Sequence, residues 1–106
     1  MTNNLNFGQA IEALKDGKRV SREGWNGKGL FVFMQVPSTI SGEIIPKMQS
    51  LPDTVKAEFA KRINEDLSIK PISYKNQLAM VYPDNTIYGW VASPSDMLEE
   101  DWCILD

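Results

Sequence analysis

The sequence predicts an α+β fold, a small antiparallel sheet with an N-terminal helix and an inserted helix. Three observations predict it. An amphipathic segment at residues 7–16 has helical spacing, short apolar segments separated by turn-forming residues occupy both ends of the chain, and a second helical segment lies in an insertion at residues 38–76. With 106 residues, 42% of them hydrophobic and 24% charged, the chain is expected to be a single domain spanning residues 1–106.

The first helix is expected to begin after Asn6. Asn6 and Gln9 have the spacing of a capping box, in which each side chain bonds the backbone N–H of the other residue. Apolar side chains then recur on one helical face, at Phe7, Ala10, Ile11 and Leu14. The helix is expected to end near Asp16, with Gly17 in the left-handed position that follows many helices.

Two strands are predicted next, at residues 18–22 and 30–36, and Pro37 stops the second. The second strand is apolar on both faces, because Phe31 and Phe33 alternate with aliphatic side chains. One small helix covers only one face of a sheet. We therefore expect the other face to meet a second layer, supplied by the insertion or by another copy of the protein.

The insertion at residues 38–76 is expected between the second and third strands. Its first part, residues 38–50, is predicted to be irregular, and a helix is predicted from about residue 52 to 66. Glu58 and Arg62 are one helical turn apart, a spacing that predicts an exposed ion pair.

A hairpin is predicted in the last third of the chain, where residues 78–82 and 86–91 flank the turn formers at 83–85. Trp90, Tyr82 and Tyr88 are candidate ligand platforms, and Tyr88 and Trp90 fall on one face of the second strand of this hairpin. The alternative is that these rings belong to the core, which is the commoner place for aromatic side chains on a strand.

A short helical turn is predicted after Ser93, which has the position of an N-cap with Asp96 at N3, and residues 101–105 form the closing strand. The hydroxyls and first-turn amides of such a turn can hold a phosphate or a ribose. Simple capping is the stronger alternative, because both side chains already occupy capping positions. Asp96 would repel an anion and suits a ribose diol better.

The segment REGWNGKG at residues 22–29 has the composition of a binding loop, with three glycines, an indole, a carboxamide and two cations. Trp25 can stack on a flat base, while Asn26 and the Gly27 amide can contact a phosphate beside Arg22 or Lys28. The alternative is a plain hairpin connection whose glycines serve turn geometry only.

Catalytic motifs are lacking. The chain has no histidine and a single cysteine, Cys103, so neither a Ser-His-Asp nor a Cys-His arrangement can form. A zinc site would need carboxylates alone, and no phosphate-binding loop with the GxxxxGK[ST] spacing occurs. Acid-base chemistry by carboxylates or lysine has no motif to support it. We therefore expect a protein that is not an enzyme and uses no cofactor or metal.

The charge pattern limits the partners. The net charge is −3, and residues 84–106 carry six acidic groups and no basic one, which disfavours binding to long nucleic acid. The longest apolar runs are strand-sized, so no membrane association is expected, and a lone cysteine fits a reducing compartment. A nucleotide needs a pocket of roughly 300–1,000 Å³, which a chain this small forms more readily between copies than in its own core. A homo-oligomer is therefore expected.

The segments NFGQA, LKDGK, REGWNGKG and WVASPSDML, followed by EDW, together resemble a small family of phage and prophage proteins, formerly of unknown function. Its best-understood members are the Thoeris anti-defence proteins of the second type. The resemblance covers about residues 6–36 and 77–105, in order. Residues 38–76 are longer than the connection associated with the family.

The resemblance implies a non-enzymatic sponge. Thoeris defence uses a TIR-domain enzyme to make a cyclic ADP-ribose isomer that activates a killing effector, and the phage protein binds this messenger without cleaving it. The resemblance also implies a homo-oligomer, expected to be a tetramer, with ligand sites between subunits, in the cytoplasm of the infected bacterial host. Cyclic oligonucleotides are a second ligand class for some members.

Residue chemistry suggests how such a messenger is held. Trp25, with Phe7 or Trp90, would bracket the adenine, and Ser93 and Asp96 would hold ribose hydroxyls. Two other classes stay open at this point. One is an enzyme that destroys a cyclic nucleotide through an aspartate such as Asp84 or Asp96. The other is a module that binds a host protein through the strand face that carries Phe31 and Phe33.

Overall fold

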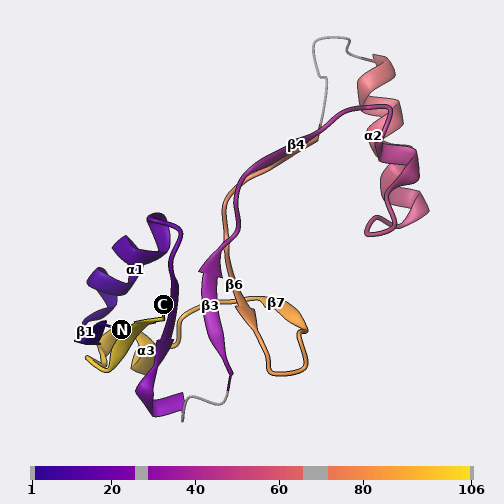
Figure 1. The fold of residues 1–106 in the computed structure, drawn as a ribbon. Helices are drawn as coiled ribbons and strands as arrows, with labels where there is room; N and C mark the ends of the chain where they lie inside the picture. The colour runs from indigo at the N-terminus through magenta and orange to yellow at the C-terminus, as the bar shows by residue number, and fades with distance from the viewer. Residues whose placement is uncertain (1, 26–28, 66–71, 106) are drawn as a thin grey trace. The chain divides into compact units, whose positions relative to one another are not determined.

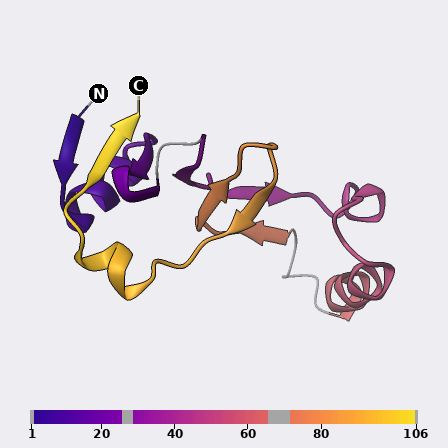
Figure 2. The same cartoon turned by 90° about the horizontal axis from the view of Figure 1, so that it is seen from below.

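The computed structural model describes residues 2–25, 29–65 and 72–105 (Figures 1 and 2). The chain divides into two compact units. The first comprises Met1–Val36 with Asn76–Asp106, and the second comprises Pro37–Lys75. Within the described residues, no helix is long and apolar enough to cross a membrane.

The first unit is built on a six-stranded sheet with the order β1-β8-β2-β3-β6-β7, in which every neighbouring pair is antiparallel. The α+β class predicted from the sequence is therefore confirmed. The strands are β1 (Thr2–Leu5), β2 (Arg19–Arg22), β3 (Phe31–Met34), β6 (Leu78–Val81), β7 (Ile87–Gly89) and β8 (Trp102–Leu105). Strand β1 pairs with β8, which brings the two ends of the chain side by side (Figure 2).

Helix α1 (Phe7–Lys15) has the predicted caps. Asn6 and Gln9 form a complete capping box, and Gly17 follows the helix with a φ of 84°. One face of the helix packs on the sheet, where the core consists of Ala10, Ala13, Leu14, Val20, Val32, Met80 and Trp102. The largest of these side chains, that of Trp102, is fully buried. Burying apolar surface contributes about 25 cal/mol per Å², so this indole is a main contributor to the stability of the unit.

The two faces of β3 differ in burial. Val32 points into the core and is fully buried, whereas Phe31 and Phe33 on the opposite face are half-buried. The guanidinium of Arg19 lies 5.3 Å from the centroid of the Phe31 ring, an arrangement that covers part of this face by a cation–π contact.

The second unit contains a two-stranded antiparallel sheet and a helix. The strands are β4 (Ser38–Ile40) and β5 (Ile72–Tyr74), and the helices are the 3-10 turn η2 (Ile45–Lys47) and α2 (Asp53–Glu65). The prediction that residues 38–50 are irregular was wrong, because β4 and η2 lie within them. The inserted helix is confirmed, and so is its surface ion pair, with Arg62 Nε 3.0 Å from Glu58 Oε2.

Two short elements complete the first unit. The 3-10 turn η1 (Glu23–Trp25) follows β2, and helix α3 (Pro94–Leu98) precedes β8. Ser93 and Asp96 form the predicted capping box at the start of α3. Trp25 lies in η1 and Asp96 in α3, and both are among the site residues singled out by the sequence.

Candidate functional site

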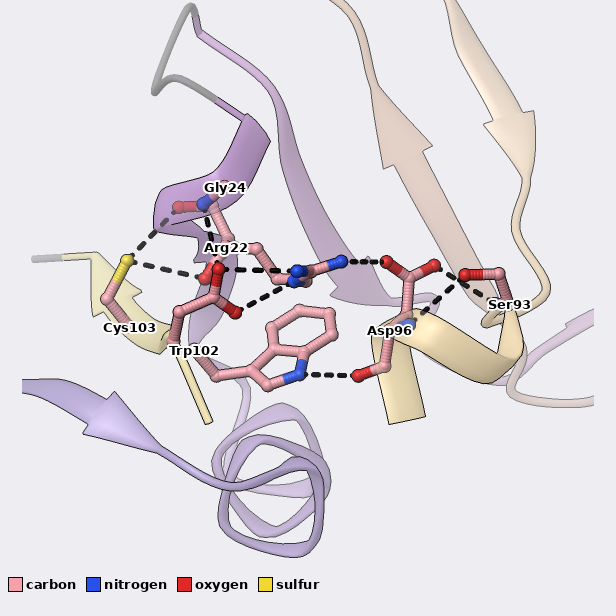
Figure 3. A network of polar contacts seen from close by, with 8 residues as sticks. Arg22, Gly24, Ser93, Asp96, Trp102 and Cys103 are labelled. Atoms are coloured by element: carbon pink, nitrogen blue, oxygen red, sulfur yellow. Dashed lines mark hydrogen bonds and ion pairs between the residues drawn. The ribbon is translucent and has the colours of Figure 1, made fainter. Parts of the chain in front are cut away.

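Arg22 is the centre of a network that joins β2, α3 and the start of β8 (Figure 3). Its Nε donates to Asp101 Oδ1 at 2.8 Å, and its Nη1 donates to Asp96 Oδ1 at 2.7 Å. Its Nη2 makes a longer bond of 3.3 Å to Asp101 Oδ2. The side chains of Arg22 and Asp96 are only 12% and 11% exposed. The guanidinium of Arg22 therefore donates its hydrogen bonds to carboxylates of the protein itself.

Asp101 also fixes the backbone of the turn that carries Trp25. The Gly24 N–H donates to Asp101 Oδ2 at 2.9 Å, and the Glu23 N–H donates to the Asp101 carbonyl oxygen at 3.0 Å. A Cβ at Gly24 would lie 2.9 Å from Asp101 Oδ2, closer than side chains approach. This glycine is needed for the close approach of the turn to the carboxylate.

Asp96 links the same network to the core. Its Oδ2 accepts from the Ser93 N–H at 3.0 Å, and its own N–H donates to Ser93 Oγ at 3.1 Å. Its carbonyl oxygen accepts from the indole N–H of Trp102 at 2.8 Å (Figure 3). The only indole N–H in the buried core thus has its partner among the described residues, as a buried donor requires.

The network sets the charge states of its members. Hydrogen bonds from Arg22 lower the pKa of Asp101 below its ordinary value. Burial opposes ionisation of Asp96, but bonds from Ser93 and Arg22 outweigh it and lower the pKa of Asp96 as well. The bond to Asp101 raises the pKa of Arg22 in turn. All three groups stay ionised near neutral pH, and neither aspartate is poised to donate a proton.

Three indoles pack together beside this network. The Trp25 ring meets Trp102 edge-on at 5.3 Å and Trp90 edge-on at 6.1 Å, measured between ring centroids, and Trp90 meets Trp102 at 6.0 Å. The Phe7 ring lies 5.5 Å from that of Trp102. Edge-to-face packing of this kind stabilises a cluster beyond its buried area. Trp25 and Trp90 are half-buried and pack against the core.

The structure thus brings together six of the residues predicted for a ligand site, namely Phe7, Arg22, Trp25, Trp90, Ser93 and Asp96. Asn26, Gly27 and Lys28 lie outside the described residues. A base held between two parallel rings needs about 7 Å between them, twice the usual carbon contact distance. Trp25 and Trp90 are closer than this and nearly perpendicular, so in this structure they contact each other. Their contact with an adenine stays a prediction.

A hollow of about 530 Å³ lies at the β6–β7 hairpin, lined by Tyr82, Pro83, Asp84, Thr86 and Tyr88. The Tyr82 and Tyr88 rings meet at 90° with centroids 5.4 Å apart, and both are at least one-third exposed. This volume lies in the range of small-molecule sites.

Asp84 forms the acidic wall of the hollow. Its Oδ1 accepts from both the N–H and the hydroxyl of Thr86, and these bonds lower its pKa. Gly29, the last residue of the REGWNGKG segment, lies beside the hollow, because a Cβ added to it would contact Pro83 at 3.7 Å. The hollow and the candidate binding loop are therefore neighbours.

Sequence reasoning missed Asp101 and gave the hollow less weight than the loop. Nothing near Asp101 distinguishes it from the neighbouring acids Glu99 and Glu100, because its partners are 77 to 79 residues away. Two residues that line the hollow, Tyr82 and Tyr88, were candidates in the sequence, ranked after the loop. Among the described residues, no cluster of three or more side chains could hold a metal ion.

Comparison with known proteins decides the family. The profile of the Tad2-like family, described as the Thoeris anti-defense 2-like domain, matches residues 5–105. A curated relative named Thoeris anti-defense 2, from Bacillus phage SP01, is 32% identical over 105 residues, which is 99% of each chain. The chain belongs to the Thoeris anti-defense 2-like family.

Membership confirms the resemblance carried by the sequence motifs. The match to the Thoeris anti-defense 2-like profile includes the network of Arg22, Asp96 and Asp101, the indole cluster and the hairpin hollow. It also runs through Pro37–Lys75, the second compact unit.

Proposed function

We propose that this protein is a phage anti-defence sponge, which binds a TIR-derived cyclic ADP-ribose isomer without cleaving it and so blocks Thoeris immunity in the cytoplasm of the infected host. The observation that carries the proposal is the family match over residues 5–105, together with a phage relative named for its action against Thoeris. The messenger itself and its sequestration are inferred from the family resemblance.

The chemistry of the site favours holding a ligand over cleaving it. The chain has no histidine, and the two aspartates beside the indole cluster have pKa values below the ordinary range. An efficient general acid or base needs a pKa near the working pH. Carboxylates that are ion-paired to Arg22 and kept ionised do not meet that requirement.

We place the nucleotide in the hollow beside Gly29. Its volume is sufficient, and its exposed tyrosine rings offer a stacking surface for a base. Asp84 would repel a phosphate and suits a ribose hydroxyl or a base N–H group. The phosphates are then expected toward the loop that joins Trp25 to Gly29, where Asn26, Gly27 and Lys28 stand in the sequence.

The site is proposed to be completed by assembly. We expect a homo-oligomer, with a tetramer as the expected form, in which a neighbouring copy closes the open hollow around the ligand. An assembled site also explains how a chain of 106 residues can enclose a dinucleotide-sized molecule. Cyclic oligonucleotides share the bases, riboses and phosphates of the messenger and are proposed as a second ligand class.

The test measures binding and the fate of the ligand in one experiment. Purified protein is titrated calorimetrically with the messenger made by a TIR enzyme, and the saturated complex is then heated and its small molecules are identified by mass spectrometry. The proposal predicts tight binding and recovery of intact messenger. Lys28→Ala and Trp25→Ala should weaken binding, whereas Lys15→Ala, which removes an exposed charge on α1, should not.

Other outcomes would replace the proposal. Recovery of hydrolysed product would establish a nucleotide-degrading enzyme. Failure to bind any cyclic nucleotide, together with capture of a host protein that is lost on substitution of Phe31 or Phe33, would establish an interaction module. Equal affinity of the parent, Lys28→Ala and Trp25→Ala would remove the loop from the site.

A further inference from the structure

The two edges of the six-stranded sheet differ in how well they are protected. Strand β1 forms one edge and is irregular, because its pairing with β8 shifts register and Asn4 has a left-handed φ of 59°. Strand β7 forms the other edge and pairs in a regular register with β6. Irregular edges resist pairing with further strands, whereas regular edges accept them.

The outer side of β7 offers a defined set of hydrogen-bonding groups. Tyr82 N–H donates to the Thr86 carbonyl and Trp90 N–H donates to the Leu78 carbonyl, so Thr86 and Trp90 turn their backbone groups toward β6. In an antiparallel ladder, the backbone N–H and C=O groups of successive residues point alternately to one side of the strand and to the other. The N–H and C=O groups of Ile87 and Gly89 therefore point outward, and in the described part of the chain no strand pairs with them.

The side chains of this edge are apolar and uncharged. Ile87 is 60% exposed and Tyr88 is 61% exposed, and no charged residue occurs between Asp84 and Asp96. Protective lysines and prolines, which natural edge strands commonly carry, are absent from β7. Although β7 is only three residues long, it carries no charge and no proline that would keep another uncharged strand away.

We infer that β7 pairs antiparallel with β7 of a second copy, so that two six-stranded sheets join into one across a two-fold axis at Tyr88. This register places Ile87 of each copy opposite Gly89 of the other and uses all the outward backbone groups of both residues. The side chain of each Ile87 then covers the open space beside the opposite Gly89, where a Cβ would meet nothing within 4 Å.

A second copy fits this edge for reasons of charge and symmetry. The edge is self-complementary, because a strand with no charge meets its own image without repulsion. Antiparallel pairing about Tyr88 also separates the two Asp84 carboxylates to opposite ends of the interface. The paired Tyr88 rings would each form part of the wall of the partner's hollow, so the second copy completes the pocket lined by Tyr82 and Tyr88.

This inference deepens the proposed assembly and does not depend on the identity of the ligand. The first test removes a single outward donor. Ile87→Pro deletes an N–H that faces away from β6, and the matched control Ile87→Thr keeps the donor and the β-branched shape. Association is followed by light scattering over a concentration series, and the urea midpoint verifies that each variant is folded. We expect Ile87→Pro to weaken association by about 10-fold or more, because both copies lose a bond, and Ile87→Thr to stay near the parent.

The second test traps the axis covalently. In a Cys103→Ser background, Tyr88→Cys places two thiols at a pair whose Cα atoms lie about 4.5 Å apart, within reach of a disulfide. Mild oxidation should give a covalent dimer. Asn3→Cys in the same background, on the irregular edge, should not.

Two results would overturn the inference. One is a folded Ile87→Pro variant that associates like the parent, and the other is a reactive Tyr88→Cys thiol that never cross-links. If the parent still assembles in those experiments, the proposed assembly stands and uses another surface. A parent protein that stays monomeric at every concentration would rule out both the β7 interface and the proposed homo-oligomer. Calorimetry would still report separately whether the messenger binds.

Discussion

The network around Arg22 and the β6–β7 hairpin contrast in how far their functional groups are satisfied. In the network, the guanidinium has two carboxylate partners and Asp96 bonds four groups of the protein itself. In the hairpin, by contrast, Ile87, Tyr82 and Tyr88 are exposed, and no strand of the described residues pairs with the outer edge of β7. The first region is rich in charge and holds the fold together, and the second offers surface to other molecules.

This contrast assigns different tasks to residues of similar type. Arginine and aspartate beside an indole have the chemistry of a nucleotide site, but here they bind one another and fix the turn that carries Trp25. A preorganised turn costs less entropy when a ligand binds. The network therefore fixes the start of the candidate binding loop at Glu23 and Gly24, whether or not the side chains of the network touch the messenger.

The largest expected effect comes from breaking the network at Asp96. Asp96→Ala removes the ion pair to Arg22 and the capping-box bond from the Ser93 N–H, keeps the bond from its own N–H to Ser93 Oγ, and leaves the guanidinium with one carboxylate partner. We expect the free energy of unfolding to fall by about 3 kcal/mol, since removing one partner of a largely buried ion pair is costly and the lost hydrogen bond from the Ser93 N–H adds about 1 kcal/mol. Urea unfolding followed by tryptophan fluorescence measures the change.

The matched control for this prediction is Glu100→Ala, which removes an exposed acid close by in the sequence. Its urea midpoint should stay near that of the parent. Equal midpoints for Asp96→Ala and the parent would contradict the structural role given to the network.

Acid should weaken the network in a definite direction. The pKa values of Asp96 and Asp101 are lowered in the folded state, so folding disfavours their protonation. Stability from these groups is complete above their unfolded pKa, about 3.9, and is lost as the pH falls through the folded values. We expect the urea midpoint to decrease once the pH is below about 4. The slope should be shallower in Arg22→Met, which lacks the cation that lowers both pKa values, and an unchanged slope would refute the cause assigned here.

The parts of this fold that depend on neighbours in the sequence could be predicted. The capping boxes at Asn6 and Ser93 each need only a partner three residues away, so their spacing identified α1 and α3. The turn formers between β6 and β7 identified the hairpin in the same way, and Asn85 takes the left-handed φ that such a turn uses.

The parts that depend on distant contacts could not be predicted. Strand β1 is polar, without the alternation that marks a half-buried strand, and exists because it pairs with β8. Likewise, Arg22 looked available for phosphate because its carboxylate partners are 74 and 79 residues away. The sequence indicated which chemistry was present at the site but could not show that this chemistry was already satisfied internally.

A substitution in the hairpin, unlike one in the Arg22 network, should change ligand affinity without changing the stability of the fold. Tyr82→Leu keeps an apolar side chain but removes a stacking ring from the hollow. Loss of one base–aromatic stack is expected to weaken messenger binding by about 10-fold, with a nearly unchanged urea midpoint, because Tyr82 is exposed. Calorimetry on the variant measures the affinity. Binding equal to that of the parent would place the ligand outside the hollow.

Two glycines give the smallest effects and opposite signs. Gly17 ends α1 with a φ of 84°, which L residues rarely adopt, so Gly17→Ala should destabilise the protein by about 1 kcal/mol. Gly89 has no such φ and has open space where a Cβ would lie, so Gly89→Ala should be neutral or stabilising by about 0.5 kcal/mol. Paired urea titrations resolve the difference in sign. If both alanines destabilised equally, Gly89 would be under a backbone constraint, and the regular, open edge ascribed to β7 would be wrong.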